Sequence, residues 1–379
     1  MKRTKRVLGL ALAAVMCMGL LAGCGGTPSN SDTADETSGT ETSEKVLNIA
    51  TIGETTTLSP LYMIADNRPT QKLLYEGLVK YVDGEIQPVL AEDWELSEDG
   101  TQLTFYLRQG VTFHDGEPFN AEAAIANIES WHINPSFASL PGVVNYTNIE
   151  AVDEYTIRLT YDTPYFAYIN DFCWPDVCTM ISPKLITQGD FQTVNGYAGT
   201  GPYIYDEYVA GQYTTFVRNE NYWGEQPYYD KIVAKYIPDN ASRVQALQTG
   251  EIDLIYGSAE LSYEDYNQAI AIDGIEGKFA PSGSTVRNII LNFNGNLSDL
   301  SVRQALAYAI DKEAISEGLT YGYEPVADTI VPDGTPYSDI CGTIDYTYNV
   351  DHANQLLDEA GWAMNCLLYT SPSPRDRQK

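Results

Sequence analysis

Hydrophobic and polar positions follow two periods along this chain, which predicts a mixed α/β fold. Some segments alternate apolar and polar residues or form short apolar runs rich in β-branched and aromatic side chains, as strands do. The predicted strands are Val46–Ala50, Leu103–Leu107, Thr156–Tyr161 and Ile252–Ile255.

Other segments place apolar residues three and four positions apart, which predicts amphipathic helices. The first spans Arg68–Lys80, and the clearest spans Ser301–Ile315. Between them, Asn120 and Asn240 are expected to cap two further helices. The second of these should end at Gly250, where a left-handed residue is favoured. We find no internal repeat.

The amino terminus has the features of an export signal. Four basic residues precede an uncharged apolar run from Val7 to Leu21, which is short for a membrane span. The run ends in Leu21-Ala22-Gly23-Cys24, which resembles a bacterial lipobox. We therefore expect residues 1–23 to be removed and Cys24 to carry the lipid. The alternative is an ordinary signal with a chance cysteine. Two acyl chains are enough for stable anchoring.

Residues 24–45 are polar and almost free of apolar side chains, which predicts a flexible stalk. At the other end, the coding sequence implied by residues 366–379 resembles a transposase adapter used in sequencing libraries. We interpret this segment as a sequencing scar and exclude it from fold reasoning. A natural disordered tail is the alternative.

The charge balance excludes one class of partner. Acidic residues number 52 and basic residues 22, for a net charge of −30. A surface this acidic repels phosphate backbones, so we exclude nucleic-acid binding. The acidity keeps the protein soluble and could favour cationic solutes.

Cysteine and histidine usage does not predict a metal centre. Cys173 and Cys178 could close a small disulfide loop in an oxidising compartment, or remain two unlinked thiols. The remaining cysteine of the mature body is Cys341, and no second ligand pair has zinc-site spacing. The histidines are scattered, at His114, His132 and His352.

Several motifs resemble those of one receptor family. The most informative are Gly199-Thr200-Gly201-Pro202-Tyr203, Arg218–Gly224 and Arg243–Leu254. Further matching blocks are Leu90–Trp94, Phe113–Gly116, Phe119–Glu122, Arg303–Asp311 and Leu356–Trp362. In this order they resemble the extracytoplasmic solute-binding proteins of ABC importers, family 5, over nearly the whole body of the chain.

The resemblance implies a bilobal α/β fold of the periplasmic-binding-protein type, class II, with an extra subdomain in lobe I. Lobe I would comprise residues 46–75 and 197–285, with residues 76–196 as the inserted subdomain. Residues 286–365 would begin a second lobe that is incomplete here. The family's acidic contact to a peptide amino terminus would lie beyond residue 365.

The resemblance also implies a transport receptor. Such a protein captures short peptides in the cleft between its lobes and delivers them to an ABC permease and its ATPase. Nickel chelates or oligosaccharides are alternatives within the family. No catalysis and no cofactor are expected, and the receptor should be a monomer on the outer face of the cell membrane, or in the periplasm of a Gram-negative cell.

Three residues are candidate ligand contacts by the same resemblance. Glu54–Pro60 is similar to a peptide-contacting stretch of the family, with Ser59 where the family has Asp, which nominates Glu54 and Thr55. Asn292 occupies the position of an acidic contact in some members, and its amide can both donate and accept. Turn capping or packing between lobes is the alternative for all three.

Two other function classes compete with this interpretation. A lipid-anchored hydrolase would need an activated nucleophile or a metal, and His114-Asp115 lacks a nucleophile placed to complete a triad. Gly199–Tyr203 lacks the Lys-Ser/Thr ending of a phosphate-binding loop. The second class is a sensory adhesin that does not transport.

Overall fold

The computed structural model describes residues 44–62, 68–82, 84–174, 177–186, 196–257, 261–279, 286–327, 329–331 and 346–362. All of these belong to one compact unit, Glu44–Lys379. The predicted signal, the stalk up to residue 43, the predicted adapter-derived tail and the cysteines Cys24 and Cys341 lie outside the described residues. Within those residues the fold is mixed α/β, as predicted.

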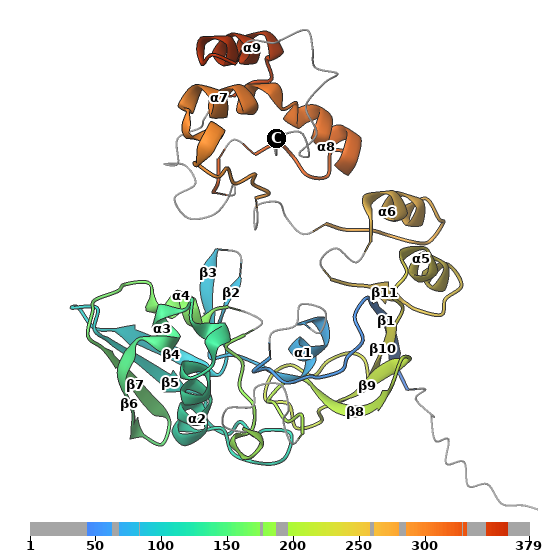
Figure 1. The fold of residues 1–379 in the computed structure, drawn as a ribbon. Coiled ribbons are helices and arrows are strands. Elements are labelled where there is room, and N and C mark those ends of the chain that lie inside the picture. Colours follow the sequence, from blue (N-terminus) through green and yellow to red (C-terminus); the bar gives the residue numbers. More distant parts are fainter. Residues whose placement is uncertain are drawn as a thin grey trace, which may run out of the picture. The chain divides into compact units, whose positions relative to one another are not determined.

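A four-stranded antiparallel sheet forms the larger core (Figure 1). Its order is β4 (Ala91–Leu96), β5 (Gln102–Leu107), β7 (Thr156–Tyr161) and β6 (Tyr146–Asp153). The predicted strands in β5 and β7 are confirmed as its central pair, with Phe105 opposite Ile157. Both side chains are fully buried, because the strands lie in the middle of the sheet under helices.

Helix α2 (Ala121–His132) packs on this sheet, as Figure 1 shows, followed by α3 (Pro141–Val144) and α4 (Tyr168–Phe172). Short 3₁₀ turns occupy Pro135–Phe137 and Pro183–Leu185. The predicted cap of α2 is confirmed, since the side-chain oxygen of Asn120 accepts from the Ala123 N–H at 3.0 Å. At the other end of α2, Trp131 is buried and stacks on Phe137.

The helix predicted at 68–80 is wrong in its second half. The chain forms α1 (Arg68–Leu74) and then a hairpin of β2 (Val79–Val82) and β3 (Glu85–Pro88). Gly77 bridges to Thr179, and a Cβ added to Gly77 would lie 2.7 Å from the Cys178 carbonyl oxygen. Because the neighbouring backbone approaches so closely here, an extended glycine replaces the predicted helical turn.

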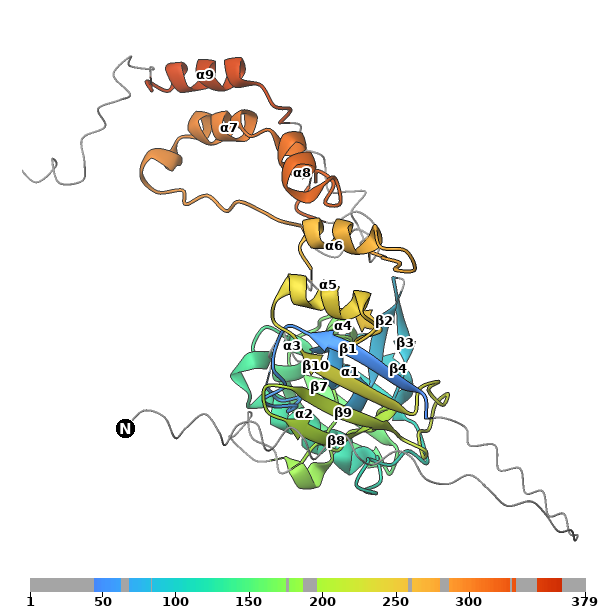
Figure 2. The ribbon, with the colours of Figure 1, turned by 90° about the vertical axis from the view of Figure 1, so that its right-hand side faces the viewer.

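A five-stranded mixed sheet forms the second core (Figure 2). Its order is β11 (Leu254–Ile255), β1 (Val46–Thr51), β10 (Lys231–Tyr236), β9 (Tyr213–Arg218) and β8 (Tyr203–Val209). Strand β1 is parallel to both its neighbours, and the remaining pairs are antiparallel. The predicted strand at 46–50 is confirmed, whereas the strand predicted at 252–255 is reduced to two residues.

The Gly199–Tyr203 segment packs against the end of α1. A Cβ on Gly199 would lie 2.0 Å from the Leu74 carbonyl oxygen, and one on Gly201 would lie 2.6 Å from that of Leu73. The Gly201 N–H donates to the Leu74 oxygen at 2.9 Å. Both glycines are therefore required for the close approach of two backbones.

Helix α5 (Asn240–Gln248) begins one residue earlier than predicted. Its cap is Asp239, whose carboxylate accepts from the Ser242 N–H at 2.8 Å, so the prediction of Asn240 as the cap is wrong. Asn240 instead lies in the first turn. The predicted end is confirmed, since Gly250 has a φ of 72°. Helix α6 (Tyr263–Ile270) follows.

The long helix predicted at 301–315 is two helices, α7 (Leu300–Ala309) and α8 (Lys312–Thr320). Ile310 is extended, and the Asp311 carboxylate caps α8 by accepting from the Ala314 N–H at 2.9 Å. A 3₁₀ turn at Gly295–Ser298 precedes α7, and α9 (Val350–Glu359) packs on α7. The predicted single helix is therefore divided at Asp311, because this aspartate caps a second helix.

The two sheets take their strands from different parts of the chain. The five-stranded sheet uses residues 46–51 and 203–255, and the four-stranded sheet uses residues 91–161. The boundaries expected for lobe I, its inserted subdomain and the start of a second lobe stay predictions.

Candidate functional site

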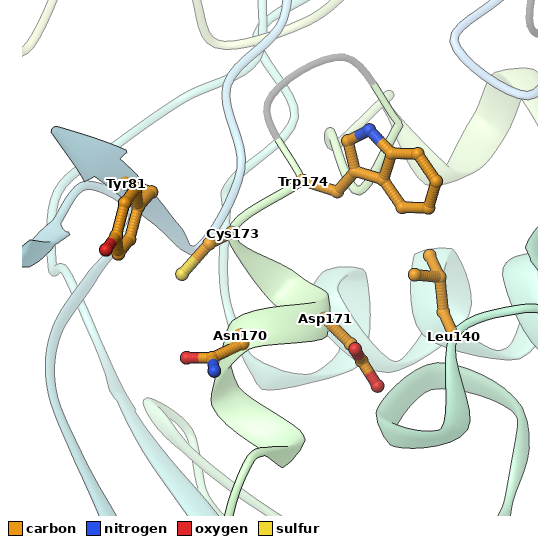
Figure 3. Close-up of a pocket in the computed structure, with 6 residues that line it drawn as sticks. All are labelled: Tyr81, Leu140, Asn170, Asp171, Cys173 and Trp174. Atoms are coloured by element: carbon orange, nitrogen blue, oxygen red, sulfur yellow. The ribbon is translucent and has the colours of Figure 1, made fainter. Parts of the chain in front are cut away.

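An open pocket of about 500 Å³ lies beside the carboxyl end of α4 (Figure 3). It is lined by Tyr81, Leu140, Asn170, Asp171, Cys173 and Trp174. These residues come from β2, from the residue before α3, and from α4 and the segment that follows it. None of the six is basic, and two are aromatic.

Packing under α4 fixes one wall of this pocket. Phe172 contacts Phe105 of β5 edge-to-face at 5.1 Å between ring centres. Tyr168 stacks on Tyr161 of β7 at 3.7 Å. The buried face of α4 is therefore held on the four-stranded sheet, and the residues on its other side are presented at the pocket.

Asp171 is the charged residue of the pocket. One carboxylate oxygen, Oδ2, accepts the backbone N–H of Gly142 at 2.6 Å and so caps α3. Burial raises the pKa of Asp171, and the hydrogen bond from Gly142 partly opposes this. No hydrogen bond from the described residues reaches its Oδ1.

Two aromatic rings stand at the pocket with much of their surface exposed. Trp174 is 41% exposed and Tyr81 is 45% exposed. Exposed aromatic rings beside a carboxylate suit a ligand with apolar parts and polar or cationic groups. The arrangement favours binding and offers no activated nucleophile.

The cysteines of the predicted loop are free thiols in the structure. Cys173 and Cys178 are both buried, and each donates to a backbone oxygen at 3.4 Å, of Ile169 and Asp171 respectively. Burial raises the pKa of Cys173 to about 11 and raises that of Cys178 as well. Neither thiol is an activated nucleophile, because a reactive cysteine needs a lowered pKa.

Glu54 holds a turn of the five-stranded sheet. Its Oε1 accepts from the Tyr208 hydroxyl and from the Gly211 N–H, both at 2.6 Å. These two hydrogen bonds lower the pKa of Glu54. The neighbouring Thr55 is buried. Neither residue lines the pocket at α4, and the role as a ligand contact stays a prediction for both.

Asn292 lies in an exposed segment before α7. Its side-chain oxygen accepts from the Asn294 N–H at 3.0 Å, which forms a local turn. The structure does not bring Asn292 together with the residues of the pocket at α4. Its predicted contact with a ligand also stays a prediction.

His114 links the two sheets through backbone contacts. Its Nε2 lies 2.9 Å from the Gly201 carbonyl oxygen, and the Gly199 N–H donates to Nδ1 at 3.3 Å. The neutral ring with the proton on Nε2 satisfies both contacts. Burial lowers the pKa of His114, against the opposing effect of the Gly201 oxygen. The His114 side chain therefore has a structural role, because it holds the backbone of the Gly199–Gly201 turn.

The pocket residues are not predicted as a group by the sequence. Trp174 lies between the two cysteines of the predicted loop, and no motif includes Tyr81 or Asp171. The available signal was an aromatic and acidic pair three residues apart, Asp171 and Trp174, beside a proline. The sequence also did not indicate Glu76, a partly buried carboxylate that accepts from Thr200, Tyr222 and Trp223.

The described residues were considered for two further features, a metal site and a membrane-spanning helix, and contain neither. No group of three or more His, Cys, Asp or Glu side chains is placed to hold a metal ion there. No helix among them is long and apolar enough to cross a membrane.

Comparison with known proteins identifies one family. Residues 85–378 match the model of the bacterial extracellular solute-binding proteins, family 5 Middle. This range includes most of the segment 366–379, and the foreign origin of that segment stays a prediction.

The chain is similar to several binding proteins along most of its length. It is 34% identical to the nickel-binding periplasmic protein of Escherichia coli K12, over 81% of this chain and 59% of that protein. It is 32% identical to the glutathione-binding protein GsiB of Pectobacterium atrosepticum, over 83% of this chain and 61% of that protein. The chain thus spans about three fifths of either relative.

A solved structure shows the same fold. The match is to NikA from Brucella suis in complex with Fe(III)-EDTA, with a TM-score of 0.78 and 33% identity. It covers 85% of this chain and 66% of that one.

Proposed function

Because the chain belongs to family 5 of the bacterial extracellular solute-binding proteins, we propose that it is the substrate-binding component of an ABC importer. It captures a small solute outside the cytoplasm and hands it to a membrane permease with an ATPase partner. The family match over residues 85–378 is the observation that carries this proposal.

The receptor works by closure of two lobes around the solute. Open and closed arrangements exchange, and a solute that contacts both lobes shifts the population toward the closed form. No bond is made or broken in this cycle. The structure supports a binding role through the aromatic and acidic pocket at α4, which contains no activated nucleophile.

The solute proposed first is a short peptide. The similarity to a glutathione-binding protein supports this, since glutathione is itself a short peptide. A peptide can be held by hydrogen bonds to its main chain, while open pockets accept different side chains. The exposed rings of Tyr81 and Trp174 would form the wall of one such pocket.

A metal chelate is the second candidate. It is favoured by the 34% identity to a nickel-binding protein and by the likeness to NikA with bound Fe(III)-EDTA. A chelated metal carries its own ligands, so it does not require a cluster of metal-binding side chains on the protein.

Three further features complete the proposal. Cys24 carries the lipid anchor that holds the receptor on the outer face of the membrane. Residues 24–45 are the stalk between lipid and domain. The receptor acts as a monomer, so that one molecule delivers one solute to the permease.

Titration calorimetry with the protein from the complete gene tests the function. The panel contains di- to pentapeptides, glutathione and nickel chelates. We expect a member of the panel to bind in a one-to-one ratio and to reduce the radius of gyration in X-ray scattering, because closure brings the lobes together.

The outcome separates receptor from enzyme. A bound solute should be recovered unchanged after prolonged incubation, and His114→Ala should not alter that recovery. Chemical conversion of any solute, or unchanged compactness with every member of the panel, would overturn the proposed function.

A further inference from the structure

We propose that the pocket at α4 selects the solute for a positively charged nitrogen group, with Asp171 as its partner. This inference rests on the proposed function and names the charge of the group that the pocket accepts. The group that the pocket would accept is an ammonium, which a peptide can supply from its amino terminus or from a lysine side chain.

The available oxygen of Asp171 is the first observation. Oδ2 is engaged by the Gly142 N–H at 2.6 Å, and Oδ1 receives no hydrogen bond from the described residues. Asp171 lines the pocket and is neither fully buried nor fully exposed. A carboxylate with one free oxygen at a pocket is ready to accept a charge-assisted hydrogen bond.

The surrounding residues supply the second observation. The other five lining residues are uncharged, so no basic side chain in the lining competes for the carboxylate. Figure 3 shows the indole of Trp174 and the carboxylate of Asp171 on one side of α4, whereas the amide of Asn170 points to the other side. An aromatic face attracts a cation electrostatically.

Partial burial of Asp171 should strengthen its interaction with a bound cation. The pKa of Asp171 is raised because water is partly excluded from its carboxylate. Partial exclusion of water also strengthens attraction between the carboxylate and a bound cation. The same pocket should therefore discriminate against a solute that presents a carboxylate there.

The test compares four peptides by calorimetry with the protein from the complete gene. They are Ala-Lys-Ala, Ala-Gln-Ala and the amino-acetylated form of each. We expect Asp171→Asn to weaken the binding of the cationic peptides by about 10- to 100-fold, and to change the affinity for acetylated Ala-Gln-Ala by less than about 3-fold. The acetylated pair reports on the lysine side chain, and the glutamine pair reports on the amino terminus.

Asp171→Asn is a matched change, because asparagine keeps an oxygen for the Gly142 N–H and replaces the free carboxylate oxygen with an uncharged NH2 group of similar size. Glu122→Gln removes a charge from the exposed start of α2, outside the pocket, and should leave all four affinities unchanged. Unaltered melting temperatures would show that both variants fold.

The outcomes distinguish this inference from the function it rests on. If peptides bind but Asp171→Asn weakens all four equally or none of them, the charge selection is wrong and the receptor function stands. If none of these peptides and no member of the wider panel binds, both proposals fall.

Discussion

At the scale of single residues, several conspicuous side chains have structural roles. His114 beside Asp115 has the look of half a catalytic dyad, yet both of its nitrogens contact backbone groups of Gly199 and Gly201. Glu54 supports Tyr208 and a turn glycine. Residues whose side chains are exposed at the pocket, such as Trp174, were not predicted from the sequence, because their exposure depends on the fold.

His114 gives a pH prediction at this scale. Its folded pKa is depressed, whereas the unfolded chain binds a proton near pH 6.5. The unfolded state therefore takes up a proton first as the pH falls. The stability that His114 contributes is present above about pH 6.5 and is lost as the pH falls through the folded pKa.

Urea denaturation between pH 7.5 and pH 5 measures this loss. His114→Gln should have a shallower decline of unfolding free energy over that range than the unchanged protein. His132→Gln is the matched control, because His132 is exposed on α2, and it should retain the full decline. Equal slopes in all three proteins would contradict the structural role assigned to His114.

At the scale of elements, local capping signals predicted one end of α2 and one end of α5 correctly, whereas two helix lengths and the start of α5 were predicted wrongly. Asn120 caps α2 as expected, and Gly250 follows α5 as expected. The helices predicted at 68–80 and 301–315 were too long for a shared reason. Each apolar pattern continued past a point where a tertiary contact or a new cap ended the helix, at Gly77 and at Asp311.

The Asn120 cap supports a specific prediction. Asn120→Ala removes the acceptor for the Ala123 N–H and should destabilise the protein by about 1 kcal/mol. Asn120→Asp keeps an acceptor at the same place, so this variant should lose little of the free energy of unfolding. Chemical denaturation followed by tryptophan fluorescence reports the change, since buried Trp131 lies at the far end of α2. An alanine variant as stable as the aspartate variant would show that the cap contributes nothing.

At the scale of the whole molecule, distant parts of the chain build each functional feature. The five-stranded sheet joins β1 to strands more than 150 residues later in the chain. The segment Gly199–Tyr203, which leads back into this sheet, packs on the end of α1. The pocket at α4 likewise gathers residues from β2 to the segment after α4. Such features rest on long-range contacts that local patterns do not encode.

The lipid anchor is a prediction about the whole molecule in its cell. Cys24→Ala should release the protein from the membrane fraction, because the cysteine thiol is the predicted site of the diacylglyceryl group and two acyl chains are sufficient for stable anchoring. Detergent phase partitioning of the expressed protein measures this. Cys17→Ala, in the predicted signal itself, is the control and should leave the protein in the detergent phase. Equal partitioning of both variants would refute the anchor at Cys24.

The sequence by itself determined the family, the α/β character, the central strands and the cap of α2, because ordered motifs, side-chain periodicity and capping are written in nearby residues. The expectation from its charge that nucleic acids are not partners stays a prediction. Only the tertiary structure decided where α1 ends, which acidic side chains are already engaged, and that Asp171 and Trp174 share a pocket with Tyr81. These outcomes depend on which backbones and side chains meet across the fold, and that information is spread over residues far apart in the chain.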